Sequence, residues 1–362
     1  MSRMLIAGLL PAALLLAAIA PALAAPAWPE QRAGDVVLRD FRFDSGETLG
    51  ELKLHYVTLG TIRRNAAGRV VNAVLLLHGT GGTLDAWLRP SLADELFAAG
   101  GPLDATKYFI ILPDGIGRGG SSKPSDGLRT KFPHYRYADM VRATHQLLTA
   151  HLRVDHLRLV MGTSMGGMQT WMWGEMYPDF MDGLVPVASQ PTAISGRNWL
   201  FRRIAIEAIR NDPDWNGGNY EKNPTRWIYS APASALMGES TLDWQRRAPS
   251  REAGDALYRE LTERASKLDA NNQLYATEAV MDYDPSRELE KIKAPLLAIN
   301  SADDAINPPE LGVVEPAIKR IPGARFVLIP ASEKTNGHLT YFQGALWRQH
   351  LAEFMNALPA VE

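Results

Sequence analysis

Six short, continuously apolar runs constrain the fold most strongly, because runs of this length are typical of strands buried on both faces of a parallel sheet. They lie at residues 72–79, 108–114, 157–164, 183–189, 295–304 and 325–332. Amphipathic stretches such as residues 137–152 separate most of them, and another follows the last run at residues 344–358. This alternation predicts a mostly parallel α/β sheet with helices on both faces.

The chain reaches these runs through a segment of different periodicity. Residues 36–43 and 51–60 alternate apolar and polar side chains, as half-buried antiparallel strands do. The "DSGETLG" segment between them is rich in turn-forming residues. We therefore expect an antiparallel hairpin ahead of the parallel strands.

The alternation of strand and helix is interrupted once, between residues 191 and 292. This stretch contains helical segments, such as 198–210 and 251–269, and no convincing parallel strand. We interpret residues 191–292 as a helical cap inserted over the carboxyl edge of the sheet, where such sheets bind ligands. The core of this single domain is then expected at residues 25–190 and 293–362.

The N-terminus has the features of a secretory signal peptide. Arg3 precedes a long apolar stretch, and Ala22-Leu23-Ala24 has the small-x-small pattern of a cleavage site. We predict that residues 1–24 are removed by cleavage after Ala24 and that the protein is periplasmic or secreted. The alternative is an uncleaved N-terminal anchor, which Pro11 within the apolar stretch disfavours. No later segment is apolar enough to span a bilayer, so no stable membrane span is expected after cleavage.

Composition excludes several classes of function. The formal net charge is −2 with no clustered basic residues, which gives no reason to expect nucleic acid as a partner. The chain has no cysteine, and this rules out disulfides, thiolate metal sites and a cysteine nucleophile. A small-molecule ester is the expected partner, and a homodimer is a candidate assembly.

One motif carries most of the chemistry. Residues 162–166 read Gly-Thr-Ser-Met-Gly and fit G-x-S-x-G, with a predicted strand before Ser164 and a predicted helix after it. The glycines leave room for a sharp strand-to-helix turn, and the first N–H groups of the helix favour a developing negative charge. We predict that Ser164 is a nucleophile; the alternative is a glycine-rich turn with an incidental serine.

A serine nucleophile needs a base, and His338 is the best candidate. It stands in "NGHLTYF", a loop between the last predicted strand and the last predicted helix. His78 ends a strand before the nucleophile and is better assigned to the oxyanion loop. The remaining histidines are interpreted as surface or core residues: His55, His134, His145, His151, His156 and His350.

The base needs a carboxylate to orient it, and this acid is expected between the nucleophile and the histidine along the chain. The segment "NSADDAINPPE" offers Asp303 and Asp304, which the local pattern alone does not separate. Asp114 is the main rival, but its "PDGIGRGGSS" surroundings are more typical of a glycine-rich turn with a capping aspartate.

The tetrahedral intermediate of acyl transfer needs two hydrogen-bond donors for its oxyanion. The N–H of Met165 is the first, and the N–H of Thr80 in "HGTGGTLDAW" is the second, with Gly81 as its alternate. These glycines match neither phosphate-binding motif, and no metal-ligand cluster is evident, so we predict no cofactor and no metal.

Longer segments resemble one family. "GTSMGGMQTWMWGEMYPDFMDGLVPVAS", "AIRNDPDWNGGNY" and "SADDAINPPE" with "GHLTYF" resemble the homoserine O-acetyltransferase branch of the α/β-hydrolase superfamily. The resemblance extends over residues 35–355 and implies an α/β-hydrolase fold. That branch has an aspartate, three residues and then Pro-Pro. The resemblance therefore selects Asp304, which Pro308-Pro309 follow at this spacing.

Two departures from this family weigh against transferase activity. The catalytic histidine of the family is commonly followed by an aspartate that helps to hold the acceptor, whereas Leu339 follows His338 here. The signal peptide directs the chain out of the cytosol, and acetyl-CoA is not expected outside it. We therefore expect an exported serine hydrolase that cleaves a carboxylic ester, an amide being less favoured. The alternatives are an O-acyltransferase to a small acceptor such as homoserine and a non-catalytic binding protein.

Side chains of the predicted cap are candidates for shaping the acyl or alcohol pocket. They are Trp199, Arg202, Arg203 and Tyr229, together with Leu339 and Gly81 outside the cap. The competing interpretation is packing, because Trp and Tyr at helical spacing are usually core residues.

Overall fold

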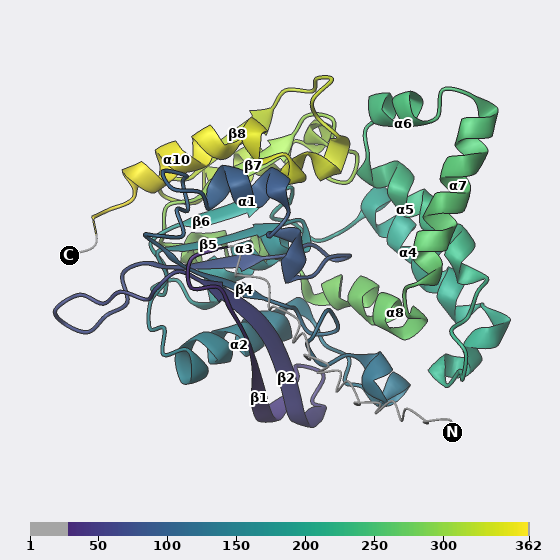
Figure 1. Cartoon of the computed structure of the whole chain (residues 1–362), viewed down its shortest axis with the longest axis horizontal. Helices are drawn as coiled ribbons and strands as arrows, with labels where there is room; N and C mark the ends of the chain where they lie inside the picture. Colours follow the sequence, from purple (N-terminus) through teal and green to yellow (C-terminus); the bar gives the residue numbers. More distant parts are fainter. Residues whose placement is uncertain (1–27, 361–362) are drawn as a thin grey trace, which may run out of the picture.

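A computed structural model describes residues 28–360, and the predicted signal peptide lies outside these described residues. Eight strands form one sheet in the order β1-β2-β4-β3-β5-β6-β7-β8 (Figure 1). The strands are β1 Arg32–Arg42, β2 Thr48–Leu59, β3 Ala73–Leu77, β4 Phe109–Pro113, β5 Leu159–Thr163, β6 Leu184–Val187, β7 Leu297–Ser301 and β8 Arg325–Ile329. Each falls on a stretch that the sequence predicts to be a strand.

The helices lie between and after these strands. They are α1 Pro90–Leu96, α2 Tyr137–Gln146, α3 Met165–Met176, α4 Gly196–Arg210, α5 Ala231–Gly238, α6 Thr241–Arg247, α7 Arg251–Ser266, α8 Ala270–Glu278, α9 Val314–Ile318 and α10 Arg348–Ala357. The helical pattern over residues 137–152 is not one α-helix, because α2 gives way to a wider π-helical turn at Leu147–His151.

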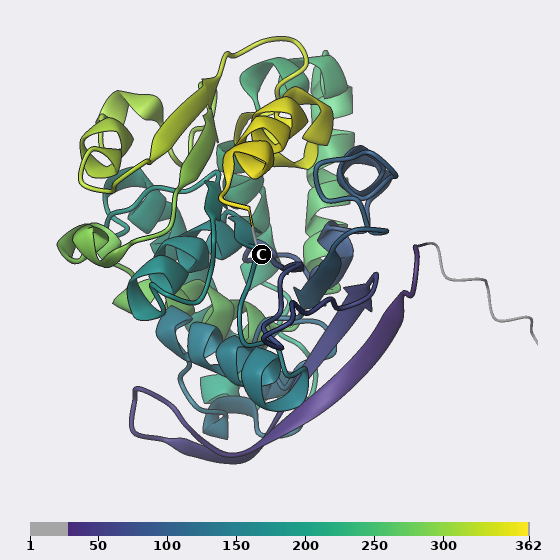
Figure 2. The same ribbon diagram turned by 90° about the vertical axis from the view of Figure 1, so that its left-hand side faces the viewer.

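The sheet is mostly parallel, as predicted. β1 pairs with β2 and β2 with β4 in antiparallel fashion, and every later pairing is parallel. The β1–β2 hairpin extends along one side of the molecule (Figure 2). β5 lies between β3 and β6, near the middle of the sheet, so the residue that follows β5 emerges at the centre of its carboxyl edge.

Two hydrophobic clusters cover the two faces of the sheet. One cluster contains apolar side chains of α2 and α3, and the other contains side chains of α1 and α10. In Figure 1, α1 and α10 are seen near β7 and β8, and α2 is seen near β1 and β2. β3, β5 and β7 are buried along their whole length, which explains their continuously apolar sequences.

The chain between β6 and β7 is helical, and we call residues 196–282 of this stretch the cap. α4 to α7 stand beside the sheet rather than on either face of it (Figure 1). The cap has a small core of its own, formed by Ile206, Ile209, Trp227, Ala270 and Leu274. Its predicted boundaries at residues 191 and 292 remain predictions.

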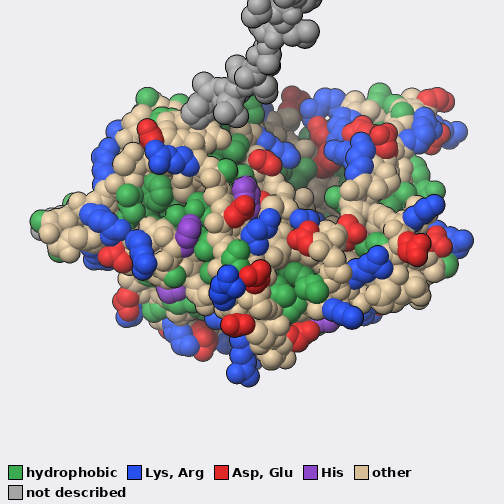
Figure 3. Space-filling model, turned by 60° about the horizontal axis from the view of Figure 1, so that its bottom comes forward, with side chains coloured by type: hydrophobic (Ala, Val, Ile, Leu, Met, Phe, Trp, Pro, Cys, Tyr) green, Lys and Arg blue, Asp and Glu red, His purple; other side chains and the backbone are tan. Residues whose placement is uncertain are grey.

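The surface charges and the hydrophobicity of the helices bear on nucleic acid and membranes as partners. Lys and Arg side chains are interspersed with Asp and Glu side chains on the face seen in Figure 3. Among the described residues, no helix combines the length and the hydrophobicity that crossing a bilayer requires.

Candidate active site

Ser164 occupies the turn between β5 and α3. Its backbone has φ 54° and ψ −113°, in the positive-φ region that residues with a Cβ rarely adopt. The Ser164 N–H donates to the carbonyl of Val187 at 2.9 Å, and the Ser164 carbonyl accepts from the Met168 N–H at 2.8 Å. These bonds hold the strained residue between the central strands and the first turn of α3, as at a nucleophile elbow.

The neighbouring glycines are required by close backbone approach. A Cβ on Gly162 would lie 2.2 Å from the Gly166 carbonyl carbon, and a Cβ on Gly166 would lie 2.1 Å from the Leu77 carbonyl oxygen. Any side chain at these positions would displace β3 or the start of α3. The glycines of the motif are therefore dictated by packing around Ser164.

Ser164, His338 and Asp304 form one hydrogen-bonded series. His338 Nε2 lies 2.8 Å from Ser164 Oγ, and His338 Nδ1 lies 2.8 Å from Asp304 Oδ2. Asp304 and His338 are 1% and 5% exposed, so water competes little for these bonds. The structure thus brings together the three residues that the sequence nominates as nucleophile, base and acid.

The second oxygen of Asp304 is held by backbone donors. Oδ1 accepts the N–H groups of Ile306 at 2.8 Å and Asn307 at 2.9 Å. Burial acts to raise the pKa of Asp304, but His338 and the Asn307 hydrogen bonds outweigh it and hold that pKa below its usual value. The carboxylate is therefore ionised at neutral pH and faces Nδ1 of His338.

Asp303, the other candidate acid, has a different position. Its Oδ2 accepts from the Thr335 hydroxyl at 2.8 Å and from the Gly337 N–H at 3.0 Å, and its Oδ1 accepts from the Ser301 hydroxyl. Thr335 and Gly337 precede His338 on the same loop. Asp303 thus anchors the backbone that carries the histidine, while Asp304 contacts the imidazole.

The loop after β3 packs against Ser164. A Cβ built on Gly79 would lie 3.4 Å from Ser164 Cβ. The buried His78 ring shapes this loop, since Nδ1 donates to the Gly79 carbonyl at 2.8 Å and Nε2 accepts from the Gly115 N–H at 2.9 Å. Burial lowers the pKa of His78, which fits this neutral tautomer.

Asp114, the rival acid, is a turn residue. Its two oxygens accept the N–H groups of Leu84 and Gly120, each at 2.8 Å. It therefore ties the loop after β3 to the glycine-rich turn after β4, the capping role that its sequence context favours.

A cavity of about 330 Å³ opens over Ser164 between the core and the cap. Its core wall comprises Thr80, Gly81, Ser164, His338, Leu339 and Tyr341. Side chains that form its cap wall include Phe201, Arg202, Ala205, Glu239, Gln273 and Thr277. The volume is at the small end of the range for ligand pockets.

Three of the cap residues nominated from the sequence are not among the residues that line this cavity. Trp199 packs between the main core and the cap core, as the competing interpretation of its aromatic side chain holds. Arg203 pairs with Glu207 along α4, and Tyr229 is 62% exposed. Of that group, only Arg202 lines the cavity.

Sequence reasoning did not nominate Phe201, Glu239, Gln273 or Tyr341. The spacing of Phe201 and Ala205, four residues apart on α4, was a usable signal for one helix face. Within residues 28–360, no group of three or more His, Asp or Glu side chains is arranged to hold a metal ion.

Comparisons with known proteins agree with the fold. A model of the α/β-hydrolase fold matches residues 72–345. A homoserine O-acetyltransferase of Moorella thermoacetica is 30% identical over 309 residues, which span 74% of this chain and 80% of that protein. A probable acyltransferase of Methanothermobacter thermautotrophicus is 29% identical over 303 residues, spanning 83% and 91%.

Among solved structures, the acetyl esterase MekB superposes with a TM-score of 0.77 at 27% identity. The match covers 90% of this chain and 97% of the esterase. The relatives thus include both transferases and esterases. The chain belongs to the α/β-hydrolase family, in the branch that contains the homoserine O-acetyltransferases.

Proposed function

We propose that this protein is an exported serine hydrolase that cleaves a carboxylic ester through an acyl-enzyme. The observation that carries the proposal is the 2.8 Å contact between Ser164 Oγ and His338 Nε2 at the base of the cavity. A nucleophile, a base and an oriented carboxylate in this order are the parts that acyl transfer requires.

Each residue has a defined role in this mechanism. His338 takes the Ser164 proton as Oγ attacks the ester carbonyl, and Asp304 stabilises the resulting imidazolium. The N–H groups of Met165 and Thr80 receive the oxyanion; Met165 begins α3, where N–H groups have no partner within the helix. His338 then protonates the leaving alcohol, and a water molecule, deprotonated by His338, releases the acid.

Water as the acceptor is supported by Leu339. This half-buried residue lines the cavity directly beside His338 and offers a prospective amino-acid acceptor no charge. An acyl-enzyme reacts with whichever nucleophile the pocket binds, so the lack of a carboxylate at position 339 to hold the acceptor's amino group favours hydrolysis. The similarity to an acetyl esterase supports the same assignment.

Transfer to a small hydroxylated acceptor such as homoserine is the second candidate. It is favoured by the 30% identity to a homoserine O-acetyltransferase over most of both chains. The two candidates share the same acyl-enzyme and differ only in the molecule that attacks it.

One experiment separates these functions. The purified protein is incubated with a short-chain 4-nitrophenyl ester, with and without homoserine, and the products are identified by mass spectrometry. We expect free acid to dominate in both incubations; a majority of acyl-homoserine would favour transfer. A fluorophosphonate probe should label the wild type and not Ser164→Ala, and a wild type that resists labelling would support a non-catalytic binding protein.

Export and assembly are separate parts of the proposal. Cell fractionation and N-terminal sequencing should find a mature chain that begins at Ala25, outside the cytoplasm. Exposed leucines on neighbouring cap helices, Leu200, Leu236 and Leu242, support a homodimer through the cap. Light scattering on the purified protein should then give twice the mass of one chain.

A further inference from the structure

Arg202 is the feature of the cavity that ester hydrolysis leaves unexplained. It projects from α4 into the cavity wall, yet its side chain belongs to a residue that is only 5% exposed. Its Nε donates to Asn198 Oδ1 at 3.1 Å. Among residues 28–360, no Asp or Glu forms an ion pair with it. A guanidinium cannot lose its charge at physiological pH, so burial without a counter-ion is costly.

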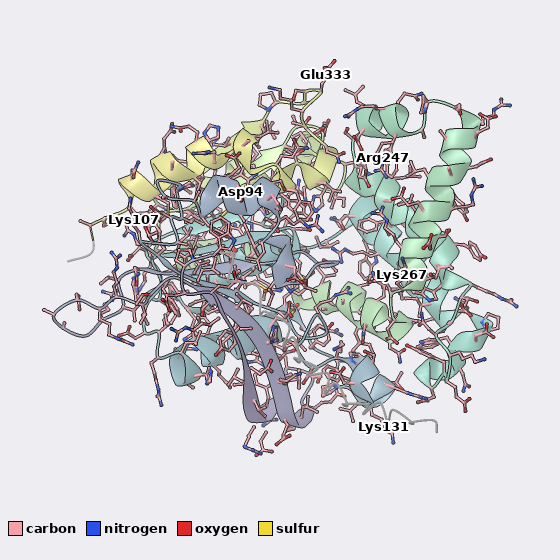
Figure 4. All side chains as sticks on the ribbon, in the orientation of Figure 1. Asp94, Lys107, Lys131, Arg247, Lys267 and Glu333 are labelled. Carbon is pink, nitrogen blue, oxygen red and sulfur yellow. The ribbon has the colours of Figure 1, made fainter. Side chains whose placement is uncertain are left out.

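The other formally charged cap residue of the cavity wall has a counter-ion, which it shares with Asp243 and Glu260. Glu239 accepts a hydrogen bond from Arg247 and forms an ion pair with it. Arg247 ends α6 on the side of the cap that faces the core (Figure 4). Arg202 therefore contributes an uncompensated positive charge to the cap wall.

A second buried guanidinium lies behind the same wall. Arg118 is 9% exposed and donates from Nη2 to Gln273 Oε1 at 3.2 Å, and Gln273 lines the cavity. Its Nε is buried with no hydrogen-bond partner, and no carboxylate of the described chain pairs with it. Burial lowers the pKa of Arg118, which is the expected penalty for a charge held away from water.

Arg202 and Arg118 both lie close enough to Tyr137 to affect its buried phenol electrostatically. Asp282 also acts on this phenol, but its two oxygens accept the backbone N–H groups of Tyr137 and Ala138 and form no ion pair with either arginine. The two positive charges raise the electrostatic potential of the adjoining cavity wall. The cavity is thus built to lower the free energy of an anion beside Ser164.

We propose that the substrate is a small ester that carries a carboxylate, and that Arg202 binds this carboxylate while Ser164 attacks the ester carbonyl. This inference rests on the proposed hydrolase function and adds the substrate class. The carboxylate supplies the counter-charge that the fold omits, and a guanidinium forms paired hydrogen bonds to it. A cavity of about 330 Å³ limits such a substrate to a small molecule.

Two matched substrate pairs test the proposal and locate the carboxylate. The 4-nitrophenyl monoester of succinate and 4-nitrophenyl butyrate differ by a carboxylate in the acyl part. Acetoxyacetate and its methyl ester differ by a carboxylate in the alcohol part. We expect the wild type to prefer the anionic member of at least one pair by kcat/KM. Arg202→Gln should lower that preference roughly 10- to 100-fold, the effect of losing a charged hydrogen bond.

Neighbouring variants control for charge and folding. Arg203→Gln removes a guanidinium that lies outside the cavity lining and should leave the preference unchanged. Arg202→Lys keeps the charge without the paired donors and should lose less of the preference than Arg202→Gln. Fluorophosphonate labelling of each variant reports whether the site around Ser164 is folded. A wild type that prefers the neutral member of both pairs, or a preference that Arg202→Gln preserves, would overturn the proposal.

Binding without turnover separates this proposal from the proposed function. Calorimetry with Ser164→Ala measures the affinity for succinate and for acetoxyacetate, and the same titrations are repeated with Ser164→Ala/Arg202→Gln. Loss of affinity in the double variant supports the anion site even if the wild type hydrolyses none of the four esters. Equal affinity in both variants contradicts the anion site, whatever the hydrolase assay shows.

Discussion

The triad at the core wall of the cavity and the arginine of its cap wall differ in how their charges are paired. On the core wall, Ser164, His338 and Asp304 each have a partner at 2.8 Å, and backbone donors hold the last carboxylate. On the cap wall, Arg202 donates to the neutral side chain of Asn198 and has no counter-ion among the described residues. A fully paired site is fixed in geometry, whereas an unpaired charge leaves a bond for a ligand to make. In the function that we propose, the core therefore carries the reaction and the cap selects the substrate.

The largest expected effect breaks the pairing on the core wall. Asp304→Asn keeps the shape of the side chain but removes the charge that stabilises the His338 imidazolium. We expect kcat on a neutral 4-nitrophenyl ester to fall about 10³- to 10⁴-fold. Steady-state kinetics measure this loss, and thermal melting checks that the variant is folded.

Asp303→Asn is the matched control, because the two aspartates are adjacent. It weakens the anchor of Thr335 and Gly337 without touching the imidazole. We expect a loss of stability of about 1–2 kcal/mol and a much smaller loss of kcat than for Asp304→Asn. If Asp303→Asn were the more damaging change to kcat, the assignment of the acid would be wrong.

A smaller effect is expected where the two walls meet. Leu339→Asp places a carboxylate beside His338, at the position where the related transferases commonly carry one. An amino-acid acceptor would gain a charged partner, so the ratio of acyl-homoserine to free acid should rise roughly tenfold. Leu339→Asn is the uncharged control, and an equal rise in that variant would show that charge is not the cause.

The smallest expected effect concerns a buried charge away from the cavity. Glu175 on α3 has a buried Oε1 without a hydrogen-bond partner, and burial together with Glu288 and Asp284 raises its pKa to about 8. Unlike Arg202, this group can lose its charge by taking up a proton. Because its pKa is raised on folding, its contribution to stability is full below the unfolded pKa, near 4.5, and is lost as the pH rises through about 8.

Glu175→Gln tests whether the protonation of Glu175 changes the stability of the fold with pH. The variant should be more stable than the wild type at pH 9 by roughly 1–2 kcal/mol, after allowance for partial exposure, and little changed at pH 4. Chemical denaturation at the two pH values measures the difference. A constant difference at both pH values would mean that Glu175 does not titrate over this range.

Most residues of the core wall were predicted from the sequence, and most residues of the cap wall were not. The difference has a physical reason. Ser164, Asp304 and His338 follow strands whose order and direction the apolar runs predict, so their meeting at one sheet edge is a consequence of topology. On the cap, helical periodicity shows which residues share a face but not which face meets the core. Arg202 and Arg203 are neighbours in sequence, and only packing directs the first into the cavity and the second to Glu207.

The cap leaves the sheet after β6 and returns at β7, which are adjacent strands. Because these strands are parallel, the chain leaves the carboxyl end of β6 and re-enters at the amino end of β7, so the cap belongs to a single crossover connection. Changes within residues 196–282 therefore need not alter the register of any strand pair. Evolution can therefore change the sequence of the cap, and with it the substrate preference, without changing the strands that position the reacting residues.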